Sequence, residues 1–218
     1  MIHSAIHKAR PDVMAAAHSH SIYGRSFCTL GRTLDTITQD ACSFHGDHVL
    51  YESFNGIVLA AEEGENIAKC LGNKKAALLQ NHGLLTVGKT VEETVFWFVS
   101  LEKCCQAQLL ADAAAGGRGG ETKKIDEEDA VYTFKAIGSP MAGYFSAKPL
   151  FDVIHKETGG DYFSRAEVRV CLRQPRTRYC CIKFRVLQSA GVHASDQGLL
   201  LSAEAVTGWF SGPKSRRN

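Results

Sequence analysis

The chain has 218 residues, of which 44% are hydrophobic and 22% are charged, so it is long enough to bury a core of its own. No run of about 18 apolar residues occurs and the N-terminal residues lack the apolar core of a secretory signal, so we expect neither a membrane span nor export. The eight cysteines are therefore expected to be reduced, mostly buried thiols of a cytoplasmic protein. The sequence has no Cys-x-x-Cys pair, which argues against a zinc ribbon and a thioredoxin-like redox motif.

The first three-quarters of the chain alternates helical and strand patterns. Apolar residues at helical or strand spacing, bounded by glycine, proline and capping residues, set the limits of each element. The clearest helix begins after Thr90, which can act as N-cap, with Glu93 three residues later completing a capping box. The predicted elements are a helix at 2–10, a buried strand at 13–20, a helix at 21–31 ending at Gly31, a strand or edge segment at 48–54, a helix at 62–72, a strand–turn–strand unit at 74–90, a long helix at 90–117 and a short helix at 126–138. This alternation predicts a layered α/β domain.

The net charge of +2 hides an asymmetry between the two ends of the chain. Residues 1–163 carry a net charge of −5, whereas residues 164–218 carry +7. The C-terminal segment mixes arginines with apolar residues and shows neither helical nor strand periodicity. We therefore predict one domain over residues 1–163 and a basic tail over residues 164–218 that is disordered or not part of the domain; a genuine basic extension is the alternative. The tail lacks the ordered basic and aromatic face of a nucleic-acid-binding protein, so we expect no nucleic-acid partner.

A pair of histidines separated by one residue, in the stretch AAAHSHSIYG, is the first candidate for chemistry. In a strand, His18 and His20 project to the same face and could bind one metal ion through two imidazoles. A catalytic metal site needs at least a third protein ligand, and the best candidate is His82 in the Asn-His-Gly turn. Gly83 next to it would let a substrate or a neighbouring backbone come close.

The alternative is that the histidine pair is a coincidence, because histidine is common in this chain. Of the remaining histidines, His3 and His7 are spaced to share one helix face, and we interpret them as surface residues or as supports of the site. The other four are not expected to be ligands, namely His45, His48, His155 and His193.

Three stretches together resemble the class II aldolase/adducin head-domain family: IHSAIHKARPDVMAAAHSHSIYGRSF, LLQNHGLLTVGKTVEET and WFVSLEKCCQAQLLA. The resemblance covers roughly residues 1–163. It implies a three-layer α/β/α domain with a central, largely antiparallel sheet, and a homo-oligomer, often a tetramer, with active sites between subunits. In enzymatic members the matching histidines bind zinc or a similar divalent metal, which implies that role for His18, His20 and His82. Asn81 and Gly83, which flank His82, are the predicted substrate-binding residues.

The resemblance implies a metal-dependent aldehyde-lyase that acts on a ketose or sugar-phosphate-like carbonyl substrate through an enediolate. Aldolase members carry an acid/base Glu four residues before the histidine that matches His3, and that position would precede Met1. The phosphate-binding loops of the family would precede Met1 as well. We therefore expect that the first part of the domain is missing, that the catalytic acid/base is absent, and that this chain alone is weakly active or inactive. The alternative function is a non-catalytic, adducin-like oligomerisation or scaffold module.

The tyrosines are the remaining candidate proton donors. The sequence offers four of them within the predicted domain without favouring one, namely Tyr23, Tyr51, Tyr132 and Tyr144.

Overall fold

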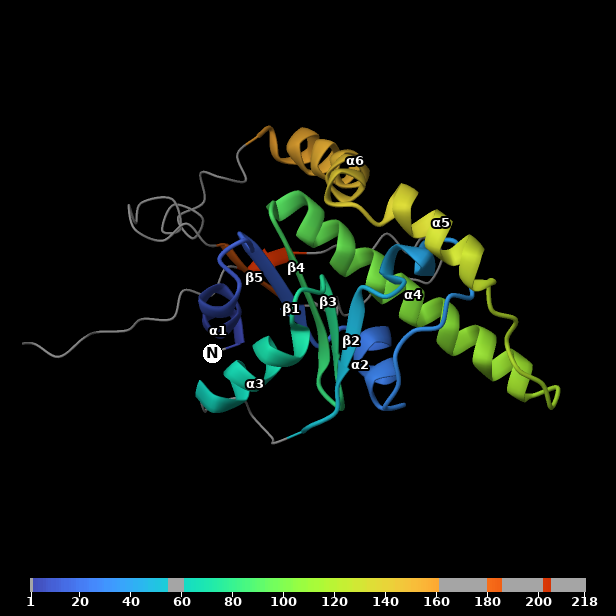
Figure 1. The fold of residues 1–218 in the computed structure, drawn as a ribbon. Helices are drawn as coiled ribbons and strands as arrows, with labels where there is room; N and C mark the ends of the chain where they lie inside the picture. Colours follow the sequence, from blue (N-terminus) through green and yellow to red (C-terminus); the bar gives the residue numbers. More distant parts are fainter. Residues whose placement is uncertain (1, 55–60, 161–179, 186–201, 205–218) are drawn as a thin grey trace, which may run out of the picture.

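The computed structural model describes residues 2–54, 61–160, 180–185 and 202–204 (Figure 1). The helices of this part of the chain are α1 (Ile2–Ala9), α2 (Ile22–Cys28), the 3-10 helix η1 (Asp40–Phe44), α3 (Ala61–Leu71), α4 (Val91–Gly116), α5 (Glu127–Ile137) and α6 (Pro140–Thr158). The strands are β1 (Ala15–Ser19), β2 (His48–Tyr51), β3 (Ala76–Leu79), β4 (Gly83–Gly88), β5 (Cys180–Arg185) and β6 (Ser202–Glu204).

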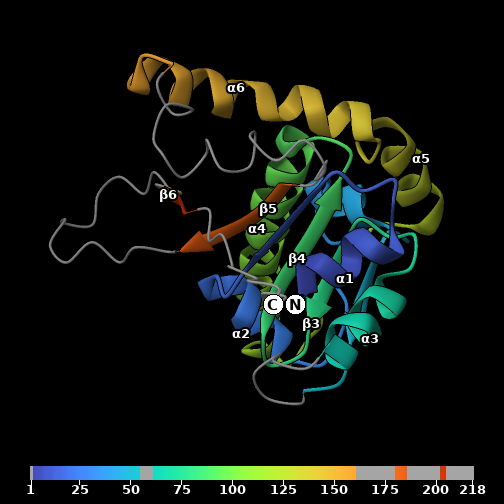
Figure 2. The ribbon, with the colours of Figure 1, turned by 90° about the vertical axis from the view of Figure 1, so that its left-hand side faces the viewer.

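The strands form one mixed sheet in the order β2-β3-β4-β1-β5-β6. Strand β4 is antiparallel to both of its neighbours, β3 and β1, while β2 pairs parallel with β3 and β5 pairs parallel with β1. Helices α1 and α3 cover one face of the sheet, and α2 and α4 cover the other (Figures 1 and 2). The predicted three-layer α/β/α class is therefore confirmed.

The core lies on both faces of the sheet because alternate residues of each strand point to opposite sides. Ala16 of β1 and Leu85 of β4 pack with Ile6 of α1 and with apolar residues of α3. Ala17 of β1 and Leu84, the residue before Leu85 in β4, pack instead in the cluster of α2 and α4. Burial on both faces explains why these strands read in the sequence as short continuous apolar runs rather than as alternating patterns.

The predicted long helix is confirmed as α4, although its capping differs from the prediction. The Thr90 side chain accepts a hydrogen bond from the Glu93 amide at 3.1 Å, as expected of an N-cap. The Glu93 carboxylate, however, accepts from the amide of Lys89 at 2.7 Å rather than from that of Thr90. The Glu93 carboxylate therefore bonds the amide one residue before the one that a capping box would use.

The 3-10 helix η1 was not among the predicted elements, and helices α2 and α6 also differ from the sequence-based expectation. Helix α2 ends at Cys28 rather than at Gly31, and Gly31 adopts φ +61° in the turn that follows. Helix α6 was not predicted, because Gly143 and Pro149 both lower helix propensity. It forms because Ser139 caps it and Pro140 opens its first turn, and because Gly143 lets it approach Trp97 of α4 closely.

The predicted basic tail lies mostly outside the described residues. Its described parts are β5 and β6, and β5 extends the sheet beside β1. The domain boundary at residue 163 stays a prediction. None of the helices in the described part of the chain is long and apolar enough to cross a membrane.

Candidate metal centre

Three histidines from separate positions in the sequence meet at one end of the sheet. His18 lies near the end of β1, His20 directly follows that strand, and His82 lies in the turn between β3 and β4. Their ring centroids are 4.7 to 5.2 Å apart, and the metal-binding atoms that each can offer lie within 4.8 Å of one another. The structure therefore brings together the three residues that the sequence analysis selected.

Gly83 is the residue that lets the two histidine segments come this close. Ser19 of β1 pairs with Leu84 of β4, so the end of β1 lies against the start of β4. A Cβ atom at Gly83 would lie only 2.4 Å from the carbonyl oxygen of Ser19 and 3.3 Å from the Cα of His20. The missing side chain at Gly83 is thus required by the neighbouring backbone, one of the two reasons anticipated for this glycine.

The turn that carries His82 depends on the conformation of Asn81. The amide of His82 donates to the carbonyl of Leu79 at 3.0 Å, which closes a four-residue turn. Asn81, in the third position of this turn, has φ +55°, a region that asparagine tolerates better than most residues. Its amide donates to the carbonyl of Cys28 at the end of α2, at 3.2 Å. Asn81 is exposed, and its predicted contact with substrate stays a proposal.

The hydrogen bonding of His18 fixes which of its nitrogens is available to a metal. Its Nδ1 lies 2.8 Å from the carbonyl oxygen of Leu84. Because a carbonyl oxygen can only accept, Nδ1 carries the proton and Nε2 keeps its lone pair. Burial, followed by the electrostatic effect of His82, lowers the pKa of His18 to about 3. Burial, followed by the effect of His20, also lowers the pKa of His82, and Glu63 opposes this shift.

This donor set fits a divalent zinc-type ion. Metal ligation requires neutral imidazoles, and the lowered pKa values of the buried His18 and the half-buried His82 favour that form. Zinc–nitrogen bonds of ~2.0–2.1 Å in a tetrahedral site would place the ligand nitrogens roughly 3.4 Å apart, and the candidate ligand atoms here lie within 4.8 Å of one another. Three protein ligands leave a fourth position for water or substrate.

Two buried carboxylates near this end of the sheet were not selected from the sequence. Glu63, in the first turn of α3, is 9% exposed and accepts a hydrogen bond from the Tyr51 hydroxyl at 2.9 Å. Acidic residues are common in the first turn of a helix because they interact favourably with the helix dipole, so nothing in the sequence indicated that Glu63 is buried. The second carboxylate is Glu102 of α4, which hydrogen-bonds to the segment that follows His20.

The tyrosines can now be distinguished by position. Tyr51 contacts Glu63, whose charge acts on His82. Tyr132 and Tyr144 are 76% and 43% exposed on α5 and α6, which lie beyond the α4 layer, on the side of the sheet opposite α1 and α3 (Figure 1). Tyr51 is therefore linked to His82 through Glu63, whereas Tyr23 lies in α2, three residues after His20, with its amide bonded to Glu102.

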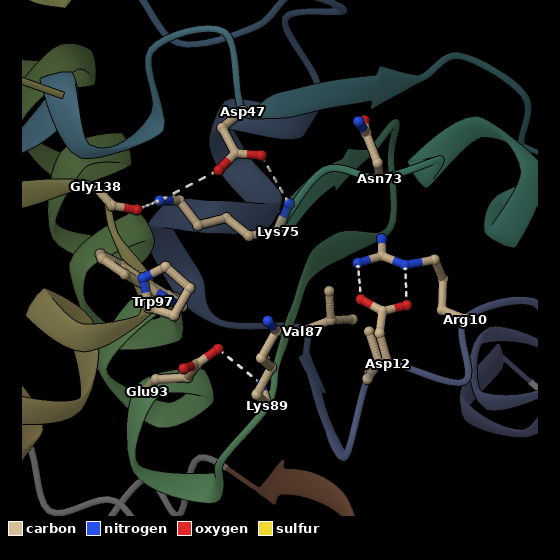
Figure 3. Close-up of a pocket in the computed structure, with 13 residues that line it drawn as sticks. Arg10, Asp12, Asp47, Asn73, Lys75, Val87, Lys89, Glu93, Trp97 and Gly138 are labelled. Carbon is tan, nitrogen blue, oxygen red and sulfur yellow. Dashed lines mark hydrogen bonds and ion pairs between the residues drawn. The ribbon is translucent and has the colours of Figure 1, made fainter. Parts of the chain in front are cut away.

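A cavity of about 310 Å³ lies at the opposite end of the sheet and is separate from the histidines (Figure 3). It is lined by Gly88 at the far end of β4, five residues from Gly83, which corresponds to roughly 17 Å of strand. Four of its charged side chains form two ion pairs, Arg10 with Asp12 at 2.7 Å and Lys75 with Asp47 at 3.4 Å, and the remaining two, Lys89 and Glu93, carry opposite charges. Because these charges are internally compensated, we assign no ligand to this cavity.

A mixed sheet between two helical layers, with three histidines gathered at one end, defines a domain of the class II aldolase type. The chain belongs to the class II aldolase and adducin N-terminal domain family, whose model matches residues 1–109.

Known proteins of this family differ in what their names describe. The chain is 47% identical over 151 residues to the decarboxylase NovR of Streptomyces niveus, covering 69% of this chain and 54% of NovR. It is 38% identical over 117 residues to mouse alpha-adducin, covering 53% of this chain and 16% of that protein. Among solved structures, an L-fuculose 1-phosphate aldolase from Glaciozyma antarctica PI12 is 52% identical with a TM-score of 0.66, covering 74% of this chain and 59% of that one. The chain thus spans about half the length of NovR and of a second Streptomyces relative, a 4-hydroxy-3-prenylphenylpyruvate oxygenase/4-hydroxy-3-prenylbenzoate synthase.

Proposed function

We propose that His18, His20 and His82 hold a zinc-type divalent ion and that the domain cleaves carbon–carbon bonds next to a carbonyl group. The observation that supports this most strongly is the convergence of the three imidazoles, with Nδ1 of His18 committed to a backbone carbonyl and Nε2 left for ligation. A divalent ion at this position supplies Lewis acidity that polarises a substrate carbonyl and stabilises the negative charge left by bond cleavage.

The residues of the chain supply the framework for this chemistry. The Leu84 carbonyl fixes the orientation of the His18 ring, and Gly83 allows the two histidine segments to approach. Burial keeps His18 and His82 unprotonated, so protons do not compete for their lone pairs near neutral pH. Asn81 and Gly83 remain the proposed substrate-contacting residues beside His82.

The substrate class we propose is a ketose or sugar phosphate, and the reaction is an aldolase-like cleavage in a cytoplasmic protein. The names of two relatives support the reaction type, because an aldolase and a decarboxylase both break a carbon–carbon bond. General acid–base groups typically supply 10²–10⁴-fold in rate, and we assign none to this chain. We therefore expect its turnover to be well below that of the aldolase it resembles.

A non-catalytic, adducin-like oligomerisation module is the second candidate, and the similarity to alpha-adducin favours it. We propose a homo-oligomer in either case, which is supported by the exposed apolar side chains of α6, including Met141 and Phe145 at 65% and 61% exposure. Light scattering of the purified chain tests the assembly; a monomer at micromolar concentration would contradict it.

Metal analysis of the purified chain, combined with a cleavage assay on L-fuculose 1-phosphate as probe, tests the proposed function. We expect close to one bound divalent ion per chain, which His82→Ala removes and His155→Ala, at an exposed histidine of α6, does not. Weak, metal-dependent aldehyde release supports the lyase. Metal binding without any cleavage supports the module, and no metal uptake at all contradicts the metal centre.

A further inference from the structure

The carboxylate of Glu102 is buried in the middle of α4 and is fully engaged with the segment that follows His20. It is 6% exposed and accepts three hydrogen bonds. The donors are the Ser21 hydroxyl at 2.5 Å, the Tyr23 amide at 2.9 Å and the Gly24 amide at 2.7 Å. Ser21 is the N-cap residue of α2, but its side chain makes no capping bond within that helix. Glu102 therefore caps α2 from the neighbouring helix.

This contact matters because the β-ladder does not hold His20. The pairing of β1 with β4 ends at Ser19, and His20 is exposed. The next residue, Ser21, is buried and is tied to Glu102. The position of the His20 backbone is thus fixed from one side by the end of the sheet and from the other side by Glu102.

The opposite end of α2 braces the turn that carries His82. The carbonyl of Cys28 accepts from the Asn81 amide at 3.2 Å, and the Cys28 thiol donates to the Gly83 carbonyl at 3.4 Å. Helix α2 cannot shift freely against these segments, because a Cβ atom at Gly24 would lie 2.4 Å from Leu84. One short helix therefore connects both histidine-bearing segments, and Glu102 fixes its start.

We infer that Glu102 is a positioning residue of the metal centre, which sets the distance between His20 and His82 through helix α2. This inference rests on the proposed function, because it takes the three histidines as metal ligands. Replacement of a residue that orients a metal ligand without binding the metal itself typically lowers metal affinity 10–100-fold. Glutamine at position 102 keeps the size of the side chain but replaces one carboxylate oxygen with an NH₂ group. Because all three partners of Glu102 are donors, that group cannot accept from them and at least one hydrogen bond is lost.

The test compares Glu102→Gln with Glu93→Gln in the full chain. Glu93 is a matched control because it is also a buried carboxylate of α4 that accepts from a backbone amide, at the other end of the sheet. Cobalt(II) titration in competition with a chromophoric chelator measures affinity, and the visible spectrum of the bound ion reports its coordination. We expect Glu102→Gln to lower cobalt affinity 10–100-fold and change the spectrum, and Glu93→Gln to leave both within about twofold of wild type.

Hydrogen exchange of the metal-free proteins provides a second measurement that does not depend on the metal. We expect faster amide exchange in Glu102→Gln over residues 21–28 and 79–84, but not in Glu93→Gln. If Glu102→Gln does not fold, Ser21→Ala removes one bond to the same carboxylate and should lower cobalt affinity a few-fold.

The outcomes separate the inference from the function on which it rests. If wild type binds cobalt and both glutamine variants bind equally well, Glu102 has no positioning role. If wild type binds no cobalt, the proposed metal centre fails, and hydrogen exchange alone decides the role of Glu102: exchange equal to wild type in both segments overturns it, and local acceleration supports it.

Discussion

Replacement of Gly83 by alanine should both destabilise the domain and weaken metal binding. The new Cβ atom would lie 2.4 Å from the carbonyl oxygen of Ser19 and 3.2 Å from its carbonyl carbon. Both atoms belong to the backbone of β1 and cannot rotate away. The Cβ–oxygen distance has to grow by roughly 1 Å to reach the ~3.5 Å at which non-bonded heavy atoms rest.

An opening of this size would disrupt the end of the β1–β4 ladder, where Ser19 pairs with Leu84. Overpacking of a well-packed interior costs about 1–3 kcal/mol, so we expect Gly83→Ala to lower the free energy of unfolding by that amount. The same movement separates His20 from His82. We therefore expect metal affinity to fall by at least tenfold, in the range seen when the support of a metal ligand is removed.

Urea unfolding of the metal-free protein and a cobalt competition titration measure the two effects. Gly116→Ala is the matched control, because a Cβ atom at Gly116 meets nothing within 4 Å near the end of α4. This control should be neutral or slightly stabilising, by up to ~1 kcal/mol. Gly83→Ala with the stability and affinity of wild type would refute the argument that the neighbouring backbone requires glycine here.

Three further predictions concern the surroundings of this site. The folded-state pKa of His18, about 3, is below its unfolded value of 6.5, so its contribution to the stability of the metal-free protein is present above pH 6.5 and lost as pH falls towards 3. Between these pH values, the free energy of unfolding measured with urea should fall more steeply with decreasing pH in wild type than in His18→Asn, by the equivalent of about one proton taken up on unfolding; equal slopes would contradict the burial argument. Lys75→Met removes an ammonium group that donates to the Gly138 carbonyl at 2.6 Å and lies 4.0 Å from the Trp97 ring centroid, so it should destabilise the domain by about 1–3 kcal/mol. Because Lys75 lies at the far end of the sheet, cobalt affinity should stay unchanged, and a tenfold loss of affinity would contradict the independence of the two ends. Asn81→Gly should keep wild-type stability whereas Asn81→Val should lose about 1–2 kcal/mol, because the φ of +55° disfavours a β-branched residue, and similar thermal unfolding of both variants would argue against that turn conformation.

The cluster of three histidines could be predicted from the sequence because its parts depend on local patterns. A strand period of two places His18 and His20 on one side, and the Asn-His-Gly turn presents His82. Apart from the 3-10 helix η1, the order of helices and strands from 2 to 138 followed from apolar spacing and capping residues in the same way.

The missed features depend on contacts between distant residues. Ser21 and Glu102 are 81 positions apart, so their hydrogen bond leaves no trace in local sequence. Helix α6 contains a glycine and a proline that argue against a helix, and its packing against Trp97 outweighs their low propensity. Only the folded sheet, with α4 behind it, shows why these residues occur where they do.

X-ray absorption at the zinc edge of the zinc-loaded chain tests the central claim most directly. The account predicts three imidazole nitrogens among the ligands at ~2.0–2.1 Å, with one of these scatterers lost in His82→Ala. Sulfur ligands at ~2.3 Å, or a chain that retains no zinc, would contradict a centre built from His18, His20 and His82.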